Sequence, residues 1–300
     1  MSAAFRCAGA SLDRDEPLTG TASTVRAFLL VENPGPWGVD ALRDSRLPER
    51  VRSGLTRAAR AAGVRVLLIR RHARRGAAVD GCRVFAAYAD PVSPWLETAL
   101  LPEPEGLLDL DLAALGAGRS PGLEPADGPL LCVCTHGRHD VCCAERGRPV
   151  AAALCESHPE ETWECSHIGG DRFAANLLVL PDGLYYGRID PQQAPSLADA
   201  TLAGELDLDH LRGRSGIPMA VQAAEIALRR ELGETRSGAV RPLTRRRTGA
   251  DLVADFEAPD GRWEVRIRTV PGSGEHLLTC GAQRENTAPD HQVLGIRRLA

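Results

Sequence analysis

The sequence predicts an α/β protein built from two successive α/β units and a small C-terminal β segment. Two observations predict the units. Strand-like apolar runs alternate with a helical pattern in the first hundred residues, and this alternation restarts after Pro129. A third observation predicts the β segment, because residues 240–300 are arginine-rich and strand-like.

The first unit contains three predicted strands and one predicted helix. Residues 25–32 form an apolar run that ends at an Asn-Pro-Gly-Pro turn. Residues 51–62 place apolar and small side chains at helical spacing, and a glycine follows them. Further strands are expected over residues 64–69 and 82–88. The proline- and glycine-rich residues 102–129 are interpreted as a linker.

The second unit repeats this alternation around a cluster of cysteines. Residues 130–134 form a predicted strand that runs into a loop containing cysteine and histidine. A short helix is expected over residues 149–156, with its proline in the first turn, where proline is tolerated. A strand over residues 162–166 follows, and then a hairpin of residues 173–180 and 184–189 around a Pro-Asp-Gly turn.

The last part of the chain carries one strong helical pattern and one hairpin pattern. Residues 217–232 place five apolar side chains on one face of a helix. Residues 251–257 and 262–270 flank an Asp-Gly turn and are expected to pair as a hairpin.

Composition excludes several classes of function. The net charge of −4 gives no sign of a nucleic-acid-binding surface, and every basic residue is arginine. No apolar run approaches the roughly 18–20 residues that cross a bilayer. The N-terminus has early charges and no apolar signal core, so a cytoplasmic location without membrane contact is expected.

The distribution of cysteine is the main chemical clue. In the cytoplasm, clustered cysteines more often indicate metal or redox chemistry than disulfides. Six of the nine cysteines fall within residues 132–165, namely Cys132, Cys134, Cys142, Cys143, Cys155 and Cys165. The other three, Cys7, Cys82 and Cys280, are interpreted as buried or isolated thiols.

Two segments place metal-binding side chains on loops. Cys134 and Cys143 lie nine positions apart across a loop, and thiolates are soft ligands for iron and zinc. Downstream, Cys165, His167 and Asp171 are three further possible ligands, and a Gly-Gly pair lets the backbone turn tightly among them. Spacing alone leaves a metal site, redox thiols and buried structural cysteines equally open.

The strings CTHGRHDVCC and ECSHIGGDRFAANLLVLPDGLYYGRI resemble the sucrase/ferredoxin-like family. The resemblance is densest over residues 130–189 and weaker over about residues 5–232. It implies two consecutive thioredoxin-like units with a C-terminal small β segment. The implied domains are residues 1–122 without a cofactor, residues 123–236 with a [2Fe–2S] cluster, and residues 237–300 as a small β appendage.

The resemblance also implies a set of cluster ligands. Fungal members bind the cluster through two cysteines and two histidines spaced H-x₃-H. By position, Cys134, Cys143 and His167 correspond to three of these ligands, and Asp171 stands where the second histidine would be. The fourth ligand stays open among Asp171, Cys165 and Cys142. Asp171 occupies the position of the family's second histidine, whereas the two cysteines offer the sulfur ligands that iron prefers.

The expected function is one-electron transfer by a [2Fe–2S] carrier rather than catalysis, with an unidentified redox partner protein. Four arginines around the two loops are either a docking patch for an acidic partner or a solvated surface: Arg138, Arg146, Arg148 and Arg172. His136 and His139 are interpreted as exposed groups or neighbours of the ligands. The alternatives are a thiol–disulfide oxidoreductase and a structural zinc-binding interaction module.

Overall fold

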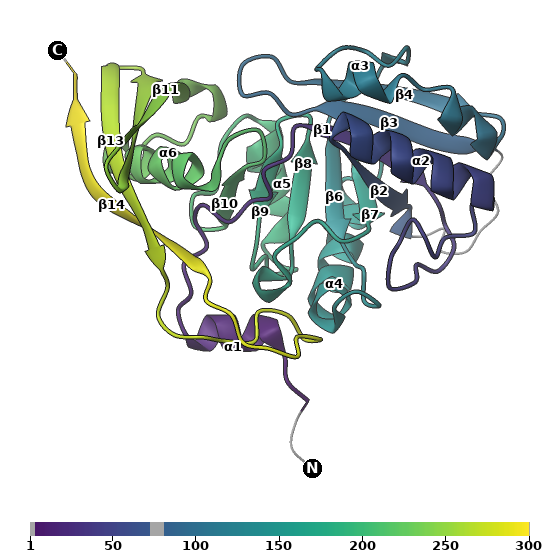
Figure 1. Cartoon of the computed structure of the whole chain (residues 1–300), viewed down its shortest axis with the longest axis horizontal. Coiled ribbons are helices and arrows are strands. Elements are labelled where there is room, and N and C mark those ends of the chain that lie inside the picture. Colours follow the sequence, from purple (N-terminus) through teal and green to yellow (C-terminus); the bar gives the residue numbers. More distant parts are fainter. Residues whose placement is uncertain (1–3, 73–80, 300) are drawn as a thin grey trace.

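The computed structural model describes residues 4–72 and 81–299, and it contains one large and one small β-sheet (Figure 1). The large sheet has ten strands in the order β10-β9-β8-β6-β7-β2-β1-β3-β4-β5. The small sheet has four strands in the order β11-β12-β13-β14. These sheets confirm the predicted α/β class and the predicted C-terminal β segment.

The first half of the large sheet is a β-α-β unit followed by a β-hairpin. Its elements are β1 (Ala27–Glu32), α2 (Glu49–Ala62), β2 (Val64–Arg70), β3 (Cys82–Tyr88) and β4 (Trp95–Leu101). Strand β1 pairs parallel to β2 and antiparallel to β3, which pairs antiparallel to β4. Helix α2 buries Val51, Leu55 and Ala59 against this sheet, as its apolar spacing predicts.

The second half of the large sheet repeats the same topology. Its elements are β6 (Leu130–Cys134), α4 (Val141–Ser157), β7 (Thr162–Cys165), η3 (Asp171–Phe173), β8 (Leu177–Leu180) and β9 (Leu184–Tyr186). Strand β6 pairs parallel to β7 and antiparallel to β8, which pairs antiparallel to β9. The order β7-β6-β8-β9 therefore repeats the order β2-β1-β3-β4, as expected of two consecutive thioredoxin-like units.

The two halves join where β2 pairs antiparallel to β7, with Ile69 opposite Cys165 and Arg70 opposite Glu164. Glu164 is completely buried and accepts hydrogen bonds from Arg70 at 2.9 Å and from the Thr135 hydroxyl at 2.9 Å. A buried carboxylate is costly unless it is paired, so this ion pair fixes the join between the halves. The domain boundaries after residues 122 and 236 stay a prediction.

Two sequence-based expectations are wrong. Residues 102–129 are not a plain linker, because they contain η2 (Pro104–Leu108), α3 (Leu112–Gly116) and β5 (Glu124–Pro125). The Asp111 carboxylate accepts the Ala114 N–H and caps α3, which buries Leu112 and Leu115. The helix expected over residues 149–156 begins at Val141, because Asp140 caps it there, and Pro149 lies inside it.

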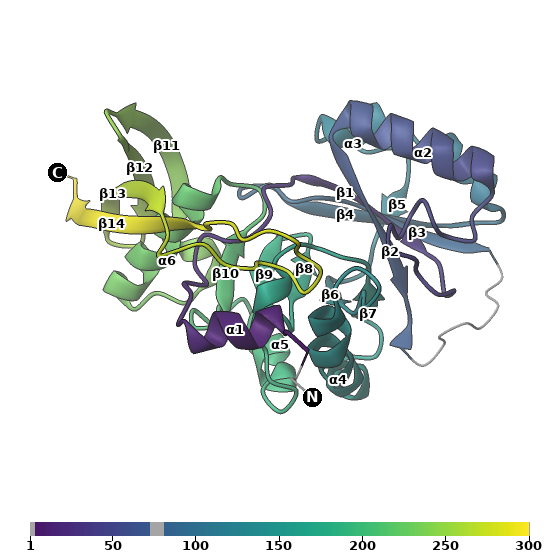
Figure 2. The same ribbon diagram turned by 60° about the horizontal axis from the view of Figure 1, so that its bottom comes forward.

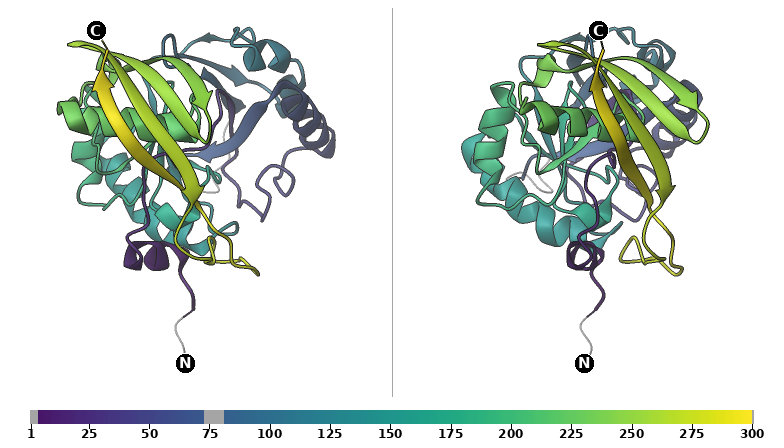
Figure 3. Two further views of the ribbon diagram at one scale, coloured as in Figure 1. Left: turned by 60° about the vertical axis from the view of Figure 1, so that its left-hand side comes forward. Right: turned by 90° about the vertical axis from the view of Figure 1, so that its left-hand side faces the viewer.

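Within the described residues, the remaining elements are four helical segments, one further strand of the large sheet and the strands of the small sheet. The helical segments are α1 (Cys7–Asp13), α5 (Ala194–Leu202), α6 (Met219–Leu232) and η4 (Ser237–Ala239), and the last strand of the large sheet is β10 (Leu211–Arg214). Helix α6 lies against the small sheet (Figure 3). On its apolar face, Val221 and Leu228 share a core with Phe256 and Ile267. The strands of the small sheet are β11 (Arg241–Thr248), β12 (Asp251–Ala258), β13 (Gly261–Pro271) and β14 (Pro289–Arg298).

Two segments that are far apart in the sequence meet at the start of α4. Helix α1 and the connection between β13 and β14 lie side by side there, as Figures 1 and 2 show. A backbone contact supports this arrangement, because the Cys7 N–H lies 3.4 Å from the Cys280 Sγ atom. In the part of the chain that the structure describes, no helix has both the length and the apolar character needed to cross a membrane.

Candidate metal centre

The first two sulfur atoms of the site come from the end of β6 and the start of α4. Cys134 is the last residue of β6, and Cys143 lies in the first turn of α4. Gly147 allows the helix to approach the strand closely, because a Cβ atom at this position would overlap the Cys134 carbonyl oxygen. The helix therefore brings Cys143 next to Cys134.

The other donors come from the loop between β7 and β8. His167 follows β7, and Asp171 begins η3. Gly169 and Gly170 have φ angles of 98° and 80°, and a Cβ atom on Gly170 would overlap the guanidinium of Arg212. Glycine is therefore required for this turn.

Arg212 holds the loop between β7 and β8 through hydrogen bonds. Its side chain is fully buried, and its Nη1 atom donates to the Gly169 carbonyl at 2.9 Å and to Asn176 Oδ1 at 2.8 Å. Asn176 also donates through Nδ2 to the Gly170 carbonyl at 2.9 Å. These bonds hold the loop in one conformation, which positions His167 and Asp171.

The structure brings together three of the predicted ligands in one group. The ligand atoms of Cys134, Cys143 and His167 all lie within 4.8 Å of one another. Asp171 contacts two of them, because the Cys143 thiol donates to Asp171 Oδ1 at 3.3 Å and His167 Nδ1 lies 2.9 Å from the same oxygen. Asp171 and His167 also form a second such group with His139.

Two other candidate ligands lie outside this group. Cys165 pairs with Cys134 across β6 and β7 and is fully buried, but its sulfur does not belong to the group of Cys134, Cys143 and His167. Cys142 belongs to a different group of side chains. Of the three alternatives for the fourth ligand, Asp171 is the one whose side-chain oxygen contacts ligand atoms of the site.

Neighbouring groups of the site shift one another's pKa values. A hydrogen bond from Cys143 and the neighbouring His167 lower the pKa of Cys134, against the opposing effect of burial. Burial by itself would lower the pKa of His167, but the adjacent Asp171 carboxylate and Cys134 raise it to about 9. The hydrogen bond to Cys134, together with burial, raises the pKa of the Cys143 thiol. The site therefore stabilises one thiolate beside an imidazolium and a carboxylate.

Two further histidines contact His167. His136 is buried, donates through Nε2 to the Gly38 carbonyl at 2.7 Å, and accepts the backbone N–H of His167 at Nδ1 at 3.3 Å. His139 is exposed, and its ring stacks on the ring of His167 with centroids 3.8 Å apart. His136 positions the loop, and His139 covers the outer side of His167.

These residues fit a metal centre. Cys134, Cys143 and Asp171 are almost completely buried, while the His167 side chain is 19% exposed. The His167 Nδ1 atom is buried without a hydrogen bond of acceptable geometry among the described residues, although Asp171 lies beside it. Two soft sulfur donors, an imidazole and a carboxylate on separate, fixed elements are a donor set that iron accepts.

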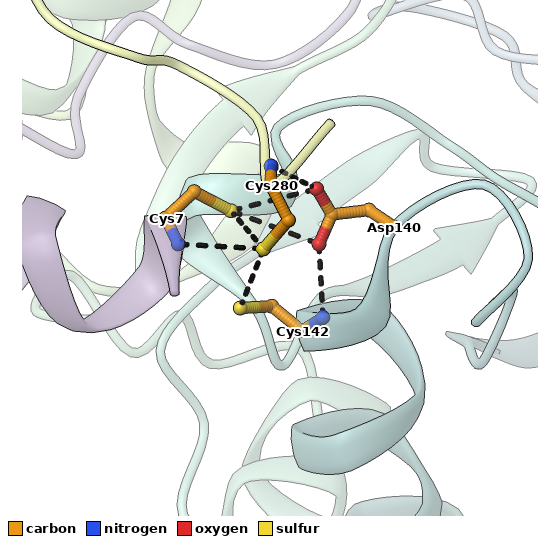
Figure 4. A group of neighbouring side chains, drawn as sticks. All are labelled: Cys7, Asp140, Cys142 and Cys280. Atoms are coloured by element: carbon orange, nitrogen blue, oxygen red, sulfur yellow. Dashed lines mark hydrogen bonds between the residues drawn. The ribbon is translucent and has the colours of Figure 1, made fainter. Parts of the chain in front are cut away.

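A second group of donors was not predicted from the sequence. Cys7, Asp140, Cys142 and Cys280 also have ligand atoms within 4.8 Å of one another (Figure 4). Cys7 and Cys280 are therefore not isolated thiols. One signal was present, because successive residues of a helix point about 100° apart, so the Cys142–Cys143 doublet could face two different sites. Nothing in the sequence indicated its distant partners.

The fold and these side chains define an α/β protein with cysteine-containing clusters that could bind a metal. The model of the sucrase/ferredoxin-like family matches residues 18–213, which is more than half of the chain, and the chain belongs to this family. A search of curated proteins found no match. A solved thioredoxin-like [2Fe–2S] ferredoxin from Aquifex aeolicus is similar at 20% identity, with a TM-score of 0.26, and the match covers 31% of this chain and 96% of that one.

Proposed function

We propose that this protein is a [2Fe–2S] electron-transfer protein whose cluster is held by Cys134, Cys143, His167 and Asp171. The observation that carries the proposal is the convergence of Cys134, Cys143 and His167 from two loops that are distant in sequence. When bound, such a cluster accepts and donates one electron. The work of the chain is to hold the cluster, set its potential and present it to a partner.

The shape of the donor set favours two irons over a single ion. Cys134 contacts Cys143, and His167 lies 2.9 Å from Asp171, so the donors form two adjacent pairs. Asp171 does not belong to the group of Cys134, Cys143 and His167, although it contacts two of its members. A [2Fe–2S] cluster takes two protein ligands at each iron, which suits paired donors.

The ligand types predict the redox behaviour. Replacing two thiolates by neutral imidazoles raises the reduction potential of a [2Fe–2S] centre, as in Rieske proteins. Asp171 in place of a second imidazole adds one negative charge. We therefore expect a potential between the Rieske range and that of plant-type ferredoxins.

The proposed docking face for a redox partner surrounds His139. The exposed His139 ring stacks on His167, so this is where the buried donors come nearest to solvent. Arg138, the residue before His139, is exposed, and it lines one surface cavity together with His136 and the exposed Arg148. Arg172 is instead engaged with Glu16 at 2.5 Å. An acidic partner protein fits the two exposed arginines, and Arg138→Glu should slow electron transfer most at low ionic strength.

Metal analysis of the whole chain tests the proposal. Protein purified without oxygen should be brown and contain about two irons and two acid-labile sulfides per chain at this site. It should give an EPR signal after reduction by one electron. Zinc at this site without iron would support the interaction module instead.

A thiol–disulfide oxidoreductase is the second candidate, because Cys134 has a lowered pKa and contacts the Cys143 thiol. The burial of both sulfurs opposes it, since a nucleophilic thiolate must be accessible to its substrate. A metal-free protein that reduces a disulfide substrate while Cys134 and Cys143 become linked would favour this candidate.

A further inference from the structure

We propose that Cys7, Asp140, Cys142 and Cys280 form a second, separate metal site that takes a single Zn²⁺ ion. The four residues come from α1, the residue that caps α4, the first turn of α4, and the connection between β13 and β14 (Figure 4). The proposal does not depend on the identity of the cofactor in the first site.

The sulfur atoms surround one point. The Cys280 Sγ atom lies 3.4 Å from that of Cys142 and 3.5 Å from that of Cys7. In a tetrahedral site with Zn–S bonds of about 2.3 Å, neighbouring sulfurs are about 3.8 Å apart. The sulfurs therefore stand near the separation that a bound zinc ion requires.

Asp140 supplies the fourth donor in a fixed orientation. Its two oxygens accept the backbone N–H of Cys142 at 2.9 Å and that of Cys280 at 2.7 Å. The same oxygens lie 3.7 and 3.6 Å from the Cys7 sulfur. The carboxylate therefore faces the thiols and keeps lone pairs available for a metal.

The charge of this site calls for a cation. Asp140 is 2% exposed, and Cys7 and Cys142 are also buried. Within residues 4–72 and 81–299, no arginine or histidine forms an ion pair with Asp140. A positive partner stabilises a buried carboxylate, and a divalent ion bound by these four donors would lie directly beside Asp140.

The donor set favours zinc over a disulfide. A disulfide would join two of the three sulfurs and leave the third thiol and the carboxylate without a role. Three thiolates and one carboxylate are ligands that zinc accepts, and together they complete the closed four-coordinate shell of a structural zinc site. All four donors form one compact group, unlike the paired donors of the first site.

The position of the site gives it a structural role next to the first centre. Cys142 and Cys143 are adjacent, so one helical turn contributes to both sites. Cys7 and Cys142 also pack against Ala174, which follows η3 and its Asp171. A zinc ion would tie α1 and the connection between β13 and β14 to α4, and would hold the turn that carries Cys143.

Metal analysis of the full-length protein with matched variants tests the site. We expect about one zinc per chain after purification with Zn²⁺ present, and a loss of nearly all of it in Cys7→Ser and Cys280→Ser, with iron and sulfide retained. Cys82→Ser, which removes a buried thiol in the other half, should keep both metals. Cys134→Ser should lose iron and keep zinc, so the two proposals fail separately.

A measurement on the unaltered protein avoids dependence on variants that fail to fold. Zinc should protect Cys7, Cys142 and Cys280 from alkylation, as read by mass spectrometry of peptides, and a chelator should remove this protection. Zinc bound equally by the Cys7→Ser and Cys280→Ser proteins would overturn the proposal. So would a Cys142–Cys280 disulfide in the protein purified without oxygen, iron in place of zinc at these residues, or protection that is independent of zinc.

Discussion

The two halves of the large sheet share a topology but differ in the residues at the ends of equivalent strands and at the starts of equivalent helices. The first strand of one half, β1, ends at Glu32, whereas the first strand of the other, β6, ends at Cys134. Helix α2 begins after Pro48 without a side-chain cap, whereas α4 is capped by Asp140 and carries two cysteines in its first turn. The scaffold is therefore common to both halves, and the residues at strand ends and helix starts of the second half provide the candidate metal ligands.

The largest expected effect is the loss of iron when a proposed ligand of the second half is replaced. Cys134→Ser and Cys143→Ser should each lose essentially all cluster iron, because each removes a thiolate from the proposed ligand set. Iron and sulfide analysis with the absorption spectrum measures this. Cys82→Ser is the matched change in the first half and should leave the iron content unchanged. Iron retained in the Cys134 and Cys143 variants would show that these cysteines are not cluster ligands.

The next largest effect is a loss of stability, which we compare between one glycine of α4 and one glycine of the equivalent helix α2. Gly147→Ala places a methyl group against the Cys134 carbonyl and should lower the free energy of unfolding by about 2–3 kcal/mol. In α2, the Cβ of Gly54→Ala would meet the end of the flexible Leu108 side chain at 2.7 Å. The better helix propensity of alanine, about 1 kcal/mol, should offset that contact.

Denaturant titration of both glycine variants provides the measurement. The Gly147→Ala protein should also bind less iron, because the helix that carries Cys143 must move away from Cys134. Equal destabilisation by the two substitutions would show that close helix–strand contact is not special to the half with the donors.

Replacing the proposed fourth ligand should give a smaller effect, a shift of the reduction potential in one expected direction. Asp171→Asn removes one negative charge and should raise the reduction potential by on the order of 100 mV, measured by EPR-monitored redox titration. Cys165→Ser is the matched control and should leave the potential and the EPR signal unchanged. The opposite result would identify Cys165 as the ligand.

The smallest effect concerns the outer face of the site. His139→Ala removes an exposed ring stacked on His167 and should lower the free energy of unfolding by less than about 1 kcal/mol. Iron content should not change. Loss of iron would instead show that His139 is a ligand, since it also lies in one group with His167 and Asp171.

The sequence predicts the large apolar elements of the fold well, because their signals are local. The strand at residues 27–32, the α2 pattern and the apolar face of α6 follow directly from side-chain spacing. The start of α4 was missed because Pro149 resembles a first-turn proline, whereas the real cap is Asp140. Strand β4 was also missed, since its residues are only partly buried and its apolar pattern is weak.

The two candidate sites differ in how far they could be predicted. The loops with Cys134, Cys143, His167 and Asp171 are marked by clustered residue types and by the family resemblance. The group of Cys7, Asp140, Cys142 and Cys280 depends on contacts of α1 and the connection between β13 and β14 with the start of α4. Such long-range contacts are set by the tertiary fold, and no spacing rule within a single sequence encodes them.

The pairing of β2 with β7 has a consequence for the protein as a whole. A fragment containing the second half alone would expose the backbone edge of β7 and leave Glu164 without Arg70. An exposed strand edge invites aggregation, and the loss of a cationic partner destabilises a buried carboxylate. The half without donors therefore covers the strand edge of the other, and we expect the two to fold and unfold as one cooperative body.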